Sequence, residues 1–239
     1  RYLVSSVSDP QKLAKILQDS EQDYWETAAI ELRKESPASA AQFGLALHDA
    51  HPNDYAPYKI LLESYQDMEQ YLLVELWARR LVDQNLRDDD GRSPAGYIHL
   101  IEALIGQGKR EEALLVGVEA IAKRPNDIRV AHELARLLPH DPSTASKRVS
   151  RAADQARQTL CQNRQTWSGQ WCSRLQAWGH ERNGNMDEAR RALRRVARRQ
   201  DNPDPLAQFF LRHEKCAELN LFFQQWNAER PNNAKKSKA

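Results

Sequence analysis

The positions of proline most constrain what this 239-residue chain can fold into. Its eleven prolines are spread along the sequence. Proline is tolerated in the first turn of a helix or beyond its end, but not in its interior. The prolines therefore leave helical segments of about 10–18 residues joined by short connections. Ser36-Pro37, Asp141-Pro142 and Asp204-Pro205 each combine an N-capping residue with proline at the first helical position.

The amino-acid composition favours helices over strands. The chain has 30 Ala and 27 Leu but only 9 Val, 8 Ile and 4 Thr. Side chains branched at the β-carbon lose rotamer freedom in helices and suit a pleated sheet. The 9 glycines are few against an average of about 7%, and neither GxGxxG nor GxxxxGK[ST] occurs. We therefore expect an all-α protein without a nucleotide-binding loop.

Charge is divided along the chain. The net charge of +2 conceals a charge of −9 over residues 1–120 and +11 over residues 121–239, which suggests docking to a charged partner or head-to-tail contacts. No uncharged apolar run approaches the roughly 18–20 residues that span a bilayer. Since the chain begins at Arg1 and not at methionine, we expect the native N-terminus, with any signal peptide or membrane anchor, to precede it. The compartment, cytoplasmic or periplasmic, stays open.

A unit of 34 residues, 94–127, carries the clearest internal pattern. Its characteristic positions are Tyr97, Leu100, Leu104, Gly108, Ala113, Gly117, Ala120 and Pro125. Tyr97, Leu100 and Leu104 form one stripe of a first helix, and Ala113 and Ala120 are small enough to let a second helix pack closely against it. The pattern resembles the tetratricopeptide repeat (TPR), a helix-turn-helix unit, with Ile101 and Gly117 departing from the family's glycine and aromatic residue.

Weaker copies of this pattern extend the frame in both directions. The resemblance implies an α-solenoid of about five TPR-like repeats, in which stacked helix pairs form a concave face lined by their first helices. HEAT-like or irregular helical repeats and a non-repeating bundle are the alternative architectures. We expect a capping segment at 1–20, repeats at 21–54, 55–88, 94–127, 128–162 and 170–203, a C-terminal capping helix region at 204–229, and a disordered basic tail at 230–239.

The family register implies a groove that binds an extended peptide or a partner helix. Its positions are mixed in sign, unlike the basic carboxylate clamps of some such proteins. The groove residues implied by the resemblance are Trp25, Ala29, Arg33, Lys59, Glu63, Gln66, Ile98, Glu102, Ile105, His132 and Arg136.

Arginine is concentrated on the expected second helix of the last repeat. Two ridges carry it at i, i+4 spacing, where like charges repel one another. This pattern predicts an anion-docking face for an acidic partner, phospholipid head groups or nucleic acid. The alternative is a solvated face neutralised by the acidic half of a neighbouring molecule. Nucleic acid is the weaker reading because no aromatic residues interleave for base stacking. The six residues are Arg190, Arg191, Arg194, Arg195, Arg198 and Arg199.

Two further groups of residues have alternative interpretations. Trp167, Trp171 and Trp178, with Arg174 between them, suit either a binding hot spot or packing between repeats, and we favour packing. Cys161 and Cys172 either form one bridge in an oxidising compartment or are buried free thiols, and we favour free thiols.

Nothing in the sequence indicates catalysis, a metal or a cofactor. HExxH and GxSxG are absent, and the cysteines and histidines lack metal-ligand spacing. We interpret His48 and His51 as a solvated helix end, and Asp88, Asp89 and Asp90 as an exposed loop.

The predicted function is therefore a non-catalytic protein–protein interaction scaffold or adaptor. It would act within a multiprotein assembly that is membrane-associated by analogy with tethered bacterial assembly factors. The alternatives are a nucleic-acid-binding helical repeat that uses the basic C-terminal half, and an accessory domain of a larger enzyme or membrane protein.

Overall fold

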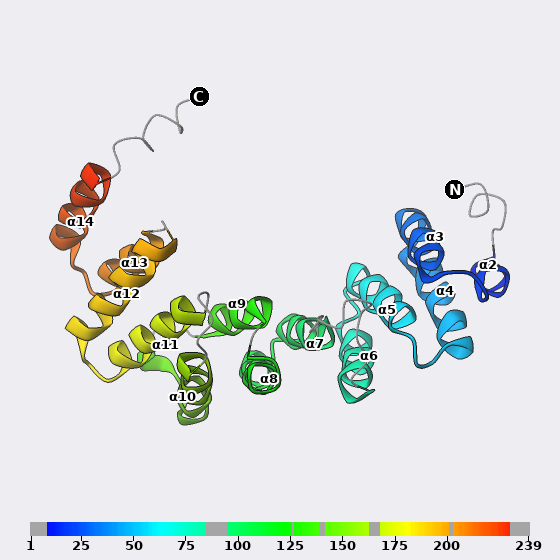
Figure 1. The fold of residues 1–239 in the computed structure, drawn as a ribbon, viewed down its shortest axis with the longest axis horizontal. Coiled ribbons are helices and arrows are strands. Elements are labelled where there is room, and N and C mark those ends of the chain that lie inside the picture. Colours follow the sequence, from blue (N-terminus) through cyan, green and yellow to red (C-terminus); the bar gives the residue numbers. More distant parts are fainter. Residues whose placement is uncertain are drawn as a thin grey trace. The chain divides into compact units, whose positions relative to one another are not determined.

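A computed structural model describes residues 9–84, 95–125, 127–138, 142–162, 168–200 and 203–229, with only the backbone described at 168–170, 199, 200 and 229. These residues form helices and connections, without a strand in the described ranges (Figure 1). The prediction of an all-α protein is confirmed.

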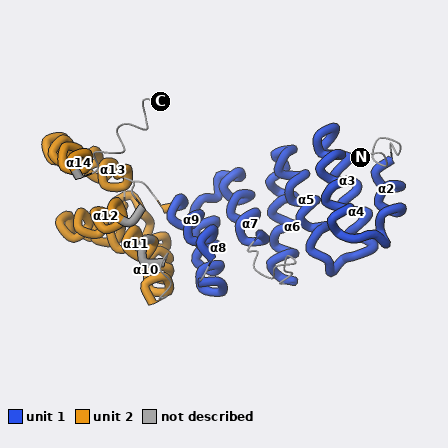
Figure 2. The backbone as a smooth tube through the Cα atoms, turned by 45° about the horizontal axis from the view of Figure 1, so that its top comes forward, with its two compact units in different colours: residues 1–137 blue, residues 138–239 orange. Residues whose placement is uncertain are grey.

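The chain divides into two compact units, residues 1–137 and 138–239 (Figure 2). The first unit contains α2 (Pro10–Leu17), α3 (Gln22–Glu35), α4 (Pro37–Ala50), α5 (Tyr55–Asp67), α6 (Tyr71–Gln84), α7 (Ala95–Gly106), α8 (Arg110–Lys123) and α9 (Ile128–Leu137). The second unit contains η1 (Pro142–Thr144), α10 (Lys147–Gln162), α11 (Ser168–Arg182), α12 (Met186–Gln200), α13 (Asp204–Arg212) and α14 (Cys216–Glu229).

Capping residues set several of the helix boundaries. The Ser36 N–H donates to the Leu32 carbonyl at the end of α3, while the Ser36 hydroxyl accepts from the Ser39 N–H at the start of α4. Ser36-Pro37 is thus the cap that its sequence predicts. Asp204-Pro205 differs, because Pro203 holds the N-cap position and Asp204 is already helical. Asp141 lies outside the described residues, and Pro142 begins a short 3₁₀ turn.

Within each unit, helices pack against their neighbours along the chain. In the segment 94–127, Leu104, Ala113 and Ala120 are fully buried, as the 34-residue sequence pattern predicts. Gly117 stands where the TPR pattern has an aromatic residue, and a β-carbon there would lie 3.1 Å from Leu134 Cδ1. The glycine therefore lets α9 approach α8 closely.

Four helix-helix connections use the same hydrogen-bonded turn. Each contains one residue in the left-handed region, namely Glu69 (φ 55°), Gly108 (φ 75°), Gly184 (φ 76°) and Glu214 (φ 55°). The N–H of the following residue donates to a carbonyl five residues back, as in Lys109 to Leu104 at 2.8 Å and Asn185 to His180 at 2.8 Å. This is the Schellman pattern that ends helices. The turns join α5 to α6, α7 to α8, α11 to α12 and α13 to α14.

The segments expected from the sequence correspond to the following helices. The capping region 204–229 is itself a pair, α13 and α14, joined by the shared turn. The boundary after Leu137 divides the segment 128–162, so that α9 belongs to the first unit and α10 to the second. The segments 21–54, 55–88, 94–127 and 170–203 each contain one helix pair. Residues 1–8, Asp88 to Asp90 and 230–239 lie outside the described residues.

Cys161 and Cys172 form a disulfide, with Cα atoms 5.0 Å apart. The preferred interpretation as free thiols is therefore wrong for this pair. α10 and α11 pack against each other, which brings together two cysteines eleven residues apart in sequence. Cys216 is an exposed free thiol. Disulfides persist mainly in oxidising compartments.

The shared turn leads to a stability prediction. Glu69→Gly should raise the free energy of unfolding by about 0.5–1 kcal/mol, because a residue with a β-carbon is strained at positive φ while glycine is not. Gly108→Ala should lower it by about 1 kcal/mol for the same reason. The measurement is urea denaturation. Gln42→Gly, in the interior of α4, is the matched control and should lose about 1 kcal/mol. A loss at Glu69→Gly as large as this would contradict the strain argument.

The disulfide leads to a second prediction. Cys161→Ser with Cys172→Ser should lower the free energy of unfolding by about 3 kcal/mol, because the reduced unfolded chain regains the entropy of a loop of this size. Thermal and urea denaturation measure the change, with Cys216→Ser as the control of little effect. Thiol titration of the native, unreduced protein should count one free thiol, and a count of three would show that the bridge does not form.

Candidate partner-binding surfaces

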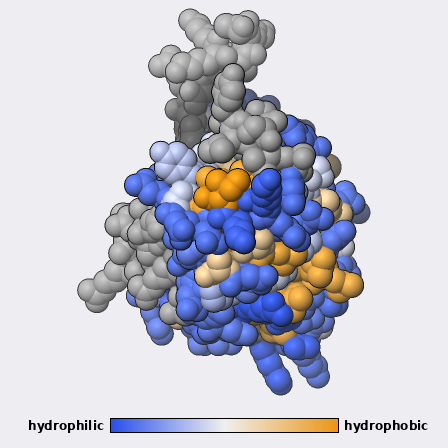
Figure 3. Space-filling model, turned by 90° about the vertical axis from the view of Figure 1, so that its right-hand side faces the viewer, coloured by the Kyte–Doolittle hydropathy of each residue, from blue (hydrophilic) through white to orange (hydrophobic). Residues whose placement is uncertain are grey.

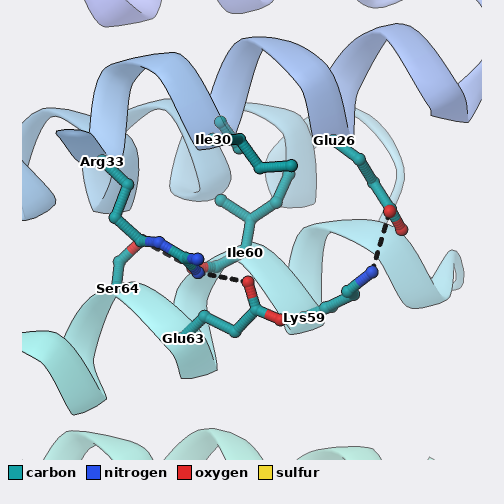
Figure 4. A pocket seen from close by; sticks show the side chains of 8 residues that line it. Glu26, Ile30, Arg33, Lys59, Ile60, Glu63 and Ser64 are labelled. Atoms are coloured by element: carbon teal, nitrogen blue, oxygen red, sulfur yellow. Dashed lines mark hydrogen bonds and ion pairs between the residues drawn. The ribbon is translucent and has the colours of Figure 1, made fainter.

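A pocket of about 160 Å³ lies between α3 and α5. Two ion pairs cross it, one between Lys59 Nζ and Glu26 Oε2 at 2.8 Å and one between the Arg33 guanidinium and the Glu63 carboxylate. Ile30 and Ile60 lie between the two pairs (Figure 4). Ile30 is 45% exposed, so the pocket offers an accessible apolar surface within a charged rim. Its lining is completed by Ala29 and Ser64.

Helical spacing explains how these side chains meet. Glu26, Ile30 and Arg33 lie three or four residues apart on α3, so they share one face. Arg33 reaches a second carboxylate, with its Nε 3.2 Å from Asp67 Oδ2. Burial lowers the pKa of Lys59, but the hydrogen bond and charge of Glu26 outweigh it, so that the pKa is raised overall. The lysine therefore stays charged at neutral pH.

Polar contacts continue this surface from α5 to α7. Gln66 Nε2 donates to Glu102 Oε2 at 3.1 Å, and His99 Nδ1 lies 3.1 Å from Gln66 Oε1. Burial lowers the pKa of His99, against the opposing charges of Glu102 and Glu63. The first helices α3, α5 and α7 are thus linked in succession by side chains 30 to 36 residues apart.

The structure brings together several of the predicted groove residues. Arg33, Lys59 and Glu63, with Ala29, line the pocket, and Gln66 and Glu102 meet beside it. On α7, Ile98 and Ile105 are half-buried, and on α9, His132 and Arg136 are exposed. Sequence reasoning missed the other four lining residues, each of which directly follows a predicted position on its helix: Glu26, Ile30, Ile60 and Ser64.

The prediction that Trp25 faces the groove is wrong. Its side chain is 2% exposed, its Nε1 donates to the Leu17 carbonyl at 2.7 Å, and its ring lies 4.8 Å from that of His51. The physical reason is that α3 packs against both α2 and α4, which places this face in the core.

The predicted arginine face of α12 contains some arginines that form ion pairs and others for which the described residues provide none. Arg190 forms ion pairs of 2.9 Å with Asp187 and with Glu218, and Arg191 pairs with Glu188. Further along the helix, Arg195 Nη2 lies 3.4 Å from Gln176 Oε1. Arg194 and Arg198 are exposed, and the side chain of Arg199 lies outside the described residues. The predicted six-arginine face is therefore neutralised over its first turn.

The tryptophan stripe of α11 supports the packing interpretation. Trp171 is 4% exposed, and the Arg174 guanidinium carbon lies 5.3 Å from the centre of its ring. Burial lowers the pKa of Arg174. Trp178 is half-buried, and Trp167 lies outside the described residues.

The interpretation of His48 as part of a solvated helix end is wrong, whereas the His51 side chain is 30% exposed. The His48 ring lies 5.1 Å from that of Tyr58 and 4.8 Å from that of Trp77, and the Arg80 guanidinium carbon lies 4.6 Å from the Trp77 ring. Burial lowers the pKa of His48, an effect that Asp49 opposes and Arg80 reinforces. These residues form an aromatic cluster between α4, α5 and α6.

Comparison of the chain with models of known protein families finds no match, and no curated protein matches it. Within the described ranges, no group of three or more His, Cys, Asp or Glu side chains is placed to hold a metal ion. Among those same residues, no helix has the length and apolar character needed to cross a membrane.

The two half-buried histidines His48 and His99 predict a pH-dependent stability. The unfolded chain takes up protons at His48 and His99 as the pH falls through their ordinary pKa of 6.5, whereas the folded protein does so only at lower pH. The free energy of unfolding should therefore be highest above about pH 7 and fall between about pH 7 and 5.5. Urea denaturation across this range measures it.

His99→Asn should flatten this slope, and His132→Asn, at an exposed position, should leave it unchanged. An identical slope in His99→Asn and the unaltered protein would show that burial does not hold the His99 imidazole neutral.

Proposed function

We propose that this protein is a non-catalytic scaffold or adaptor, built as a TPR-like α-solenoid, whose first helices bind an extended peptide or helix of a partner protein. Three features support this architecture. Helix pairs recur along each unit, four of them share one turn, and α3, α5 and α7 are joined by contacts at the spacing of one repeat. Concave surfaces of such arrays suit extended ligands.

The pocket between α3 and α5 carries the proposal. An apolar side chain of the partner would pack on the exposed Ile30, next to the buried Ile60, and its polar groups would exchange hydrogen bonds with the rim. Because Lys59, Glu26, Arg33 and Glu63 are paired with one another, the rim is electrically balanced. A ligand of mixed charge fits it better than nucleic acid, which requires an excess of cations.

On the face shown in Figure 3, hydrophobic residues occupy limited areas between hydrophilic ones. Apolar residues scattered in this way are common on protein surfaces, so the proposal rests on the α3–α5 pocket and not on this pattern. The Cys161–Cys172 disulfide supports action in an oxidising compartment, such as a periplasm.

A peptide selection tests this function. A phage-displayed library of random peptides, panned on the purified chain, should enrich peptides with an aliphatic or aromatic side chain between polar ones. Ile30→Glu should weaken binding of a selected peptide by about tenfold or more, because a carboxylate would replace the apolar contact. Fluorescence anisotropy measures the affinity.

The matched control is Leu72→Glu, which places the same charge on α6 at a residue that is 71% exposed. Circular dichroism checks that both variants keep their helices. Equal affinity of Ile30→Glu and Leu72→Glu for the selected peptides would place binding elsewhere.

A further inference from the structure

A second pocket, of about 80 Å³, lies in the C-terminal unit between α12 and α14. Arg194 and Arg198 of α12 form one side of it, one helical turn apart. Phe222 and Trp226 of α14 contribute to the other side. Its lining is completed by Ala197 and Gln225. The pocket thus sets two cations against an aromatic wall.

The charges at this pocket differ from those on the rest of the helix. Arg190 and Arg191 are neutralised by Asp187, Glu188 and Glu218. Neither Arg194 nor Arg198 forms an ion pair or hydrogen bond with another residue in the described part of the chain. Two guanidinium groups without carboxylate partners attract an anion, and they can bind a carboxylate through paired hydrogen bonds.

The aromatic wall belongs to a well-packed core. Phe222 is 9% exposed, and its ring lies 5.6 Å from that of Trp226 and 6.1 Å from that of Phe210. The half-buried Trp226 offers the remaining apolar surface of the pocket. A ligand that fits must therefore carry an apolar group next to its negative charge.

We infer that this pocket binds an acidic peptide segment of a partner protein. An Asp or Glu carboxylate of the segment pairs with Arg194 and Arg198, and a neighbouring aliphatic or aromatic side chain packs on Trp226. An extended polyanion gains less, because Asp187, Glu188 and Glu218 already pair with Arg190 and Arg191, which leaves few cations along the helix for further phosphate groups. The site is separate from the α3–α5 pocket and takes a ligand of different charge.

The test is a peptide selection with a counter-selection. A phage-displayed random library is panned on the full chain after depletion on the variant Arg194→Gln/Arg198→Gln. Enriched peptides should contain Asp or Glu beside an aliphatic or aromatic residue. In fluorescence anisotropy, Arg194→Gln/Arg198→Gln should weaken binding of such a peptide by about tenfold or more. Ile30→Glu should leave this binding unchanged, which separates the result from the proposed function.

The matched control is Arg191→Gln/Arg195→Gln, which removes the same charge from the same helix outside the pocket. It should change the affinity by less than about twofold. Equal losses of affinity in the two double variants would show that binding depends only on the net charge of the helix, and would overturn the proposal. Failure to enrich acidic peptides would also overturn it.

Two further outcomes would assign the pocket to a different occupant. Tighter binding of a single-stranded oligothymidylate than of the selected peptide, lost in Arg194→Gln/Arg198→Gln, would replace the peptide with nucleic acid. Self-association in sedimentation velocity, lost only in that same variant, would replace it with a second copy of this chain.

Discussion

A single helix cannot bury its apolar stripe by itself, and most of the described helices are covered mainly by their neighbours along the chain. The structure depends on this constraint, because the chain must reverse its direction within a short turn for the apolar stripes of two successive helices to meet. The shared turn at Glu69, Gly108, Gly184 and Glu214 provides the reversal. Small residues then let adjacent helices approach, as Gly117 of α8 does for Leu134 of α9. The apolar core of each unit is consequently built from successive helix–helix interfaces.

Polar contacts also join helices that are not consecutive, through side chains 31 to 33 residues apart in sequence. Arg79 Nη2 on α6 pairs with Glu112 on α8 at 2.9 Å. In the second unit, Glu181 on α11 is only 5% exposed, and it accepts hydrogen bonds of 2.9 Å from both Nε and Nη2 of Arg212. A buried carboxylate is costly unless it is fully paired, so this contact permits one register of α13 against α11 and penalises the others. Apolar stripes alone would tolerate a shift of one helix along the other, whereas such ion pairs would be broken by it.

Sequence reasoning succeeds where one residue type has one structural meaning. Proline and the balance of Ala and Leu predict many short helices, and Ser36-Pro37 marks the junction between α3 and α4. It fails where a residue acts against its usual preference or where the partner is remote in sequence. Glutamate has no preference for positive φ, so the turns at Glu69 and Glu214 carry no signal comparable to Gly184. The assignment of Trp25 to the groove is wrong because α2, which lies outside the expected repeats, packs against the face of α3 that carries Trp25 and buries it in the core.

The two candidate surfaces differ in how their charged side chains are paired, and the two proposals therefore predict different ligands. In the α3–α5 pocket each charged group already has a partner, so a ligand gains mainly from apolar contact, and salt should influence its affinity little. At the α12–α14 pocket, Arg194 and Arg198 have no ion-pair partner among the described residues, so their attraction for an anion acts at long range and weakens as ionic strength rises. Since the surfaces lie in different units, one partner can be selected by shape and another by charge. Under the two proposals, the arginines without a partner in the described part of the chain, Arg194 and Arg198, lie in the basic half, whereas the charges around the α3–α5 pocket balance one another.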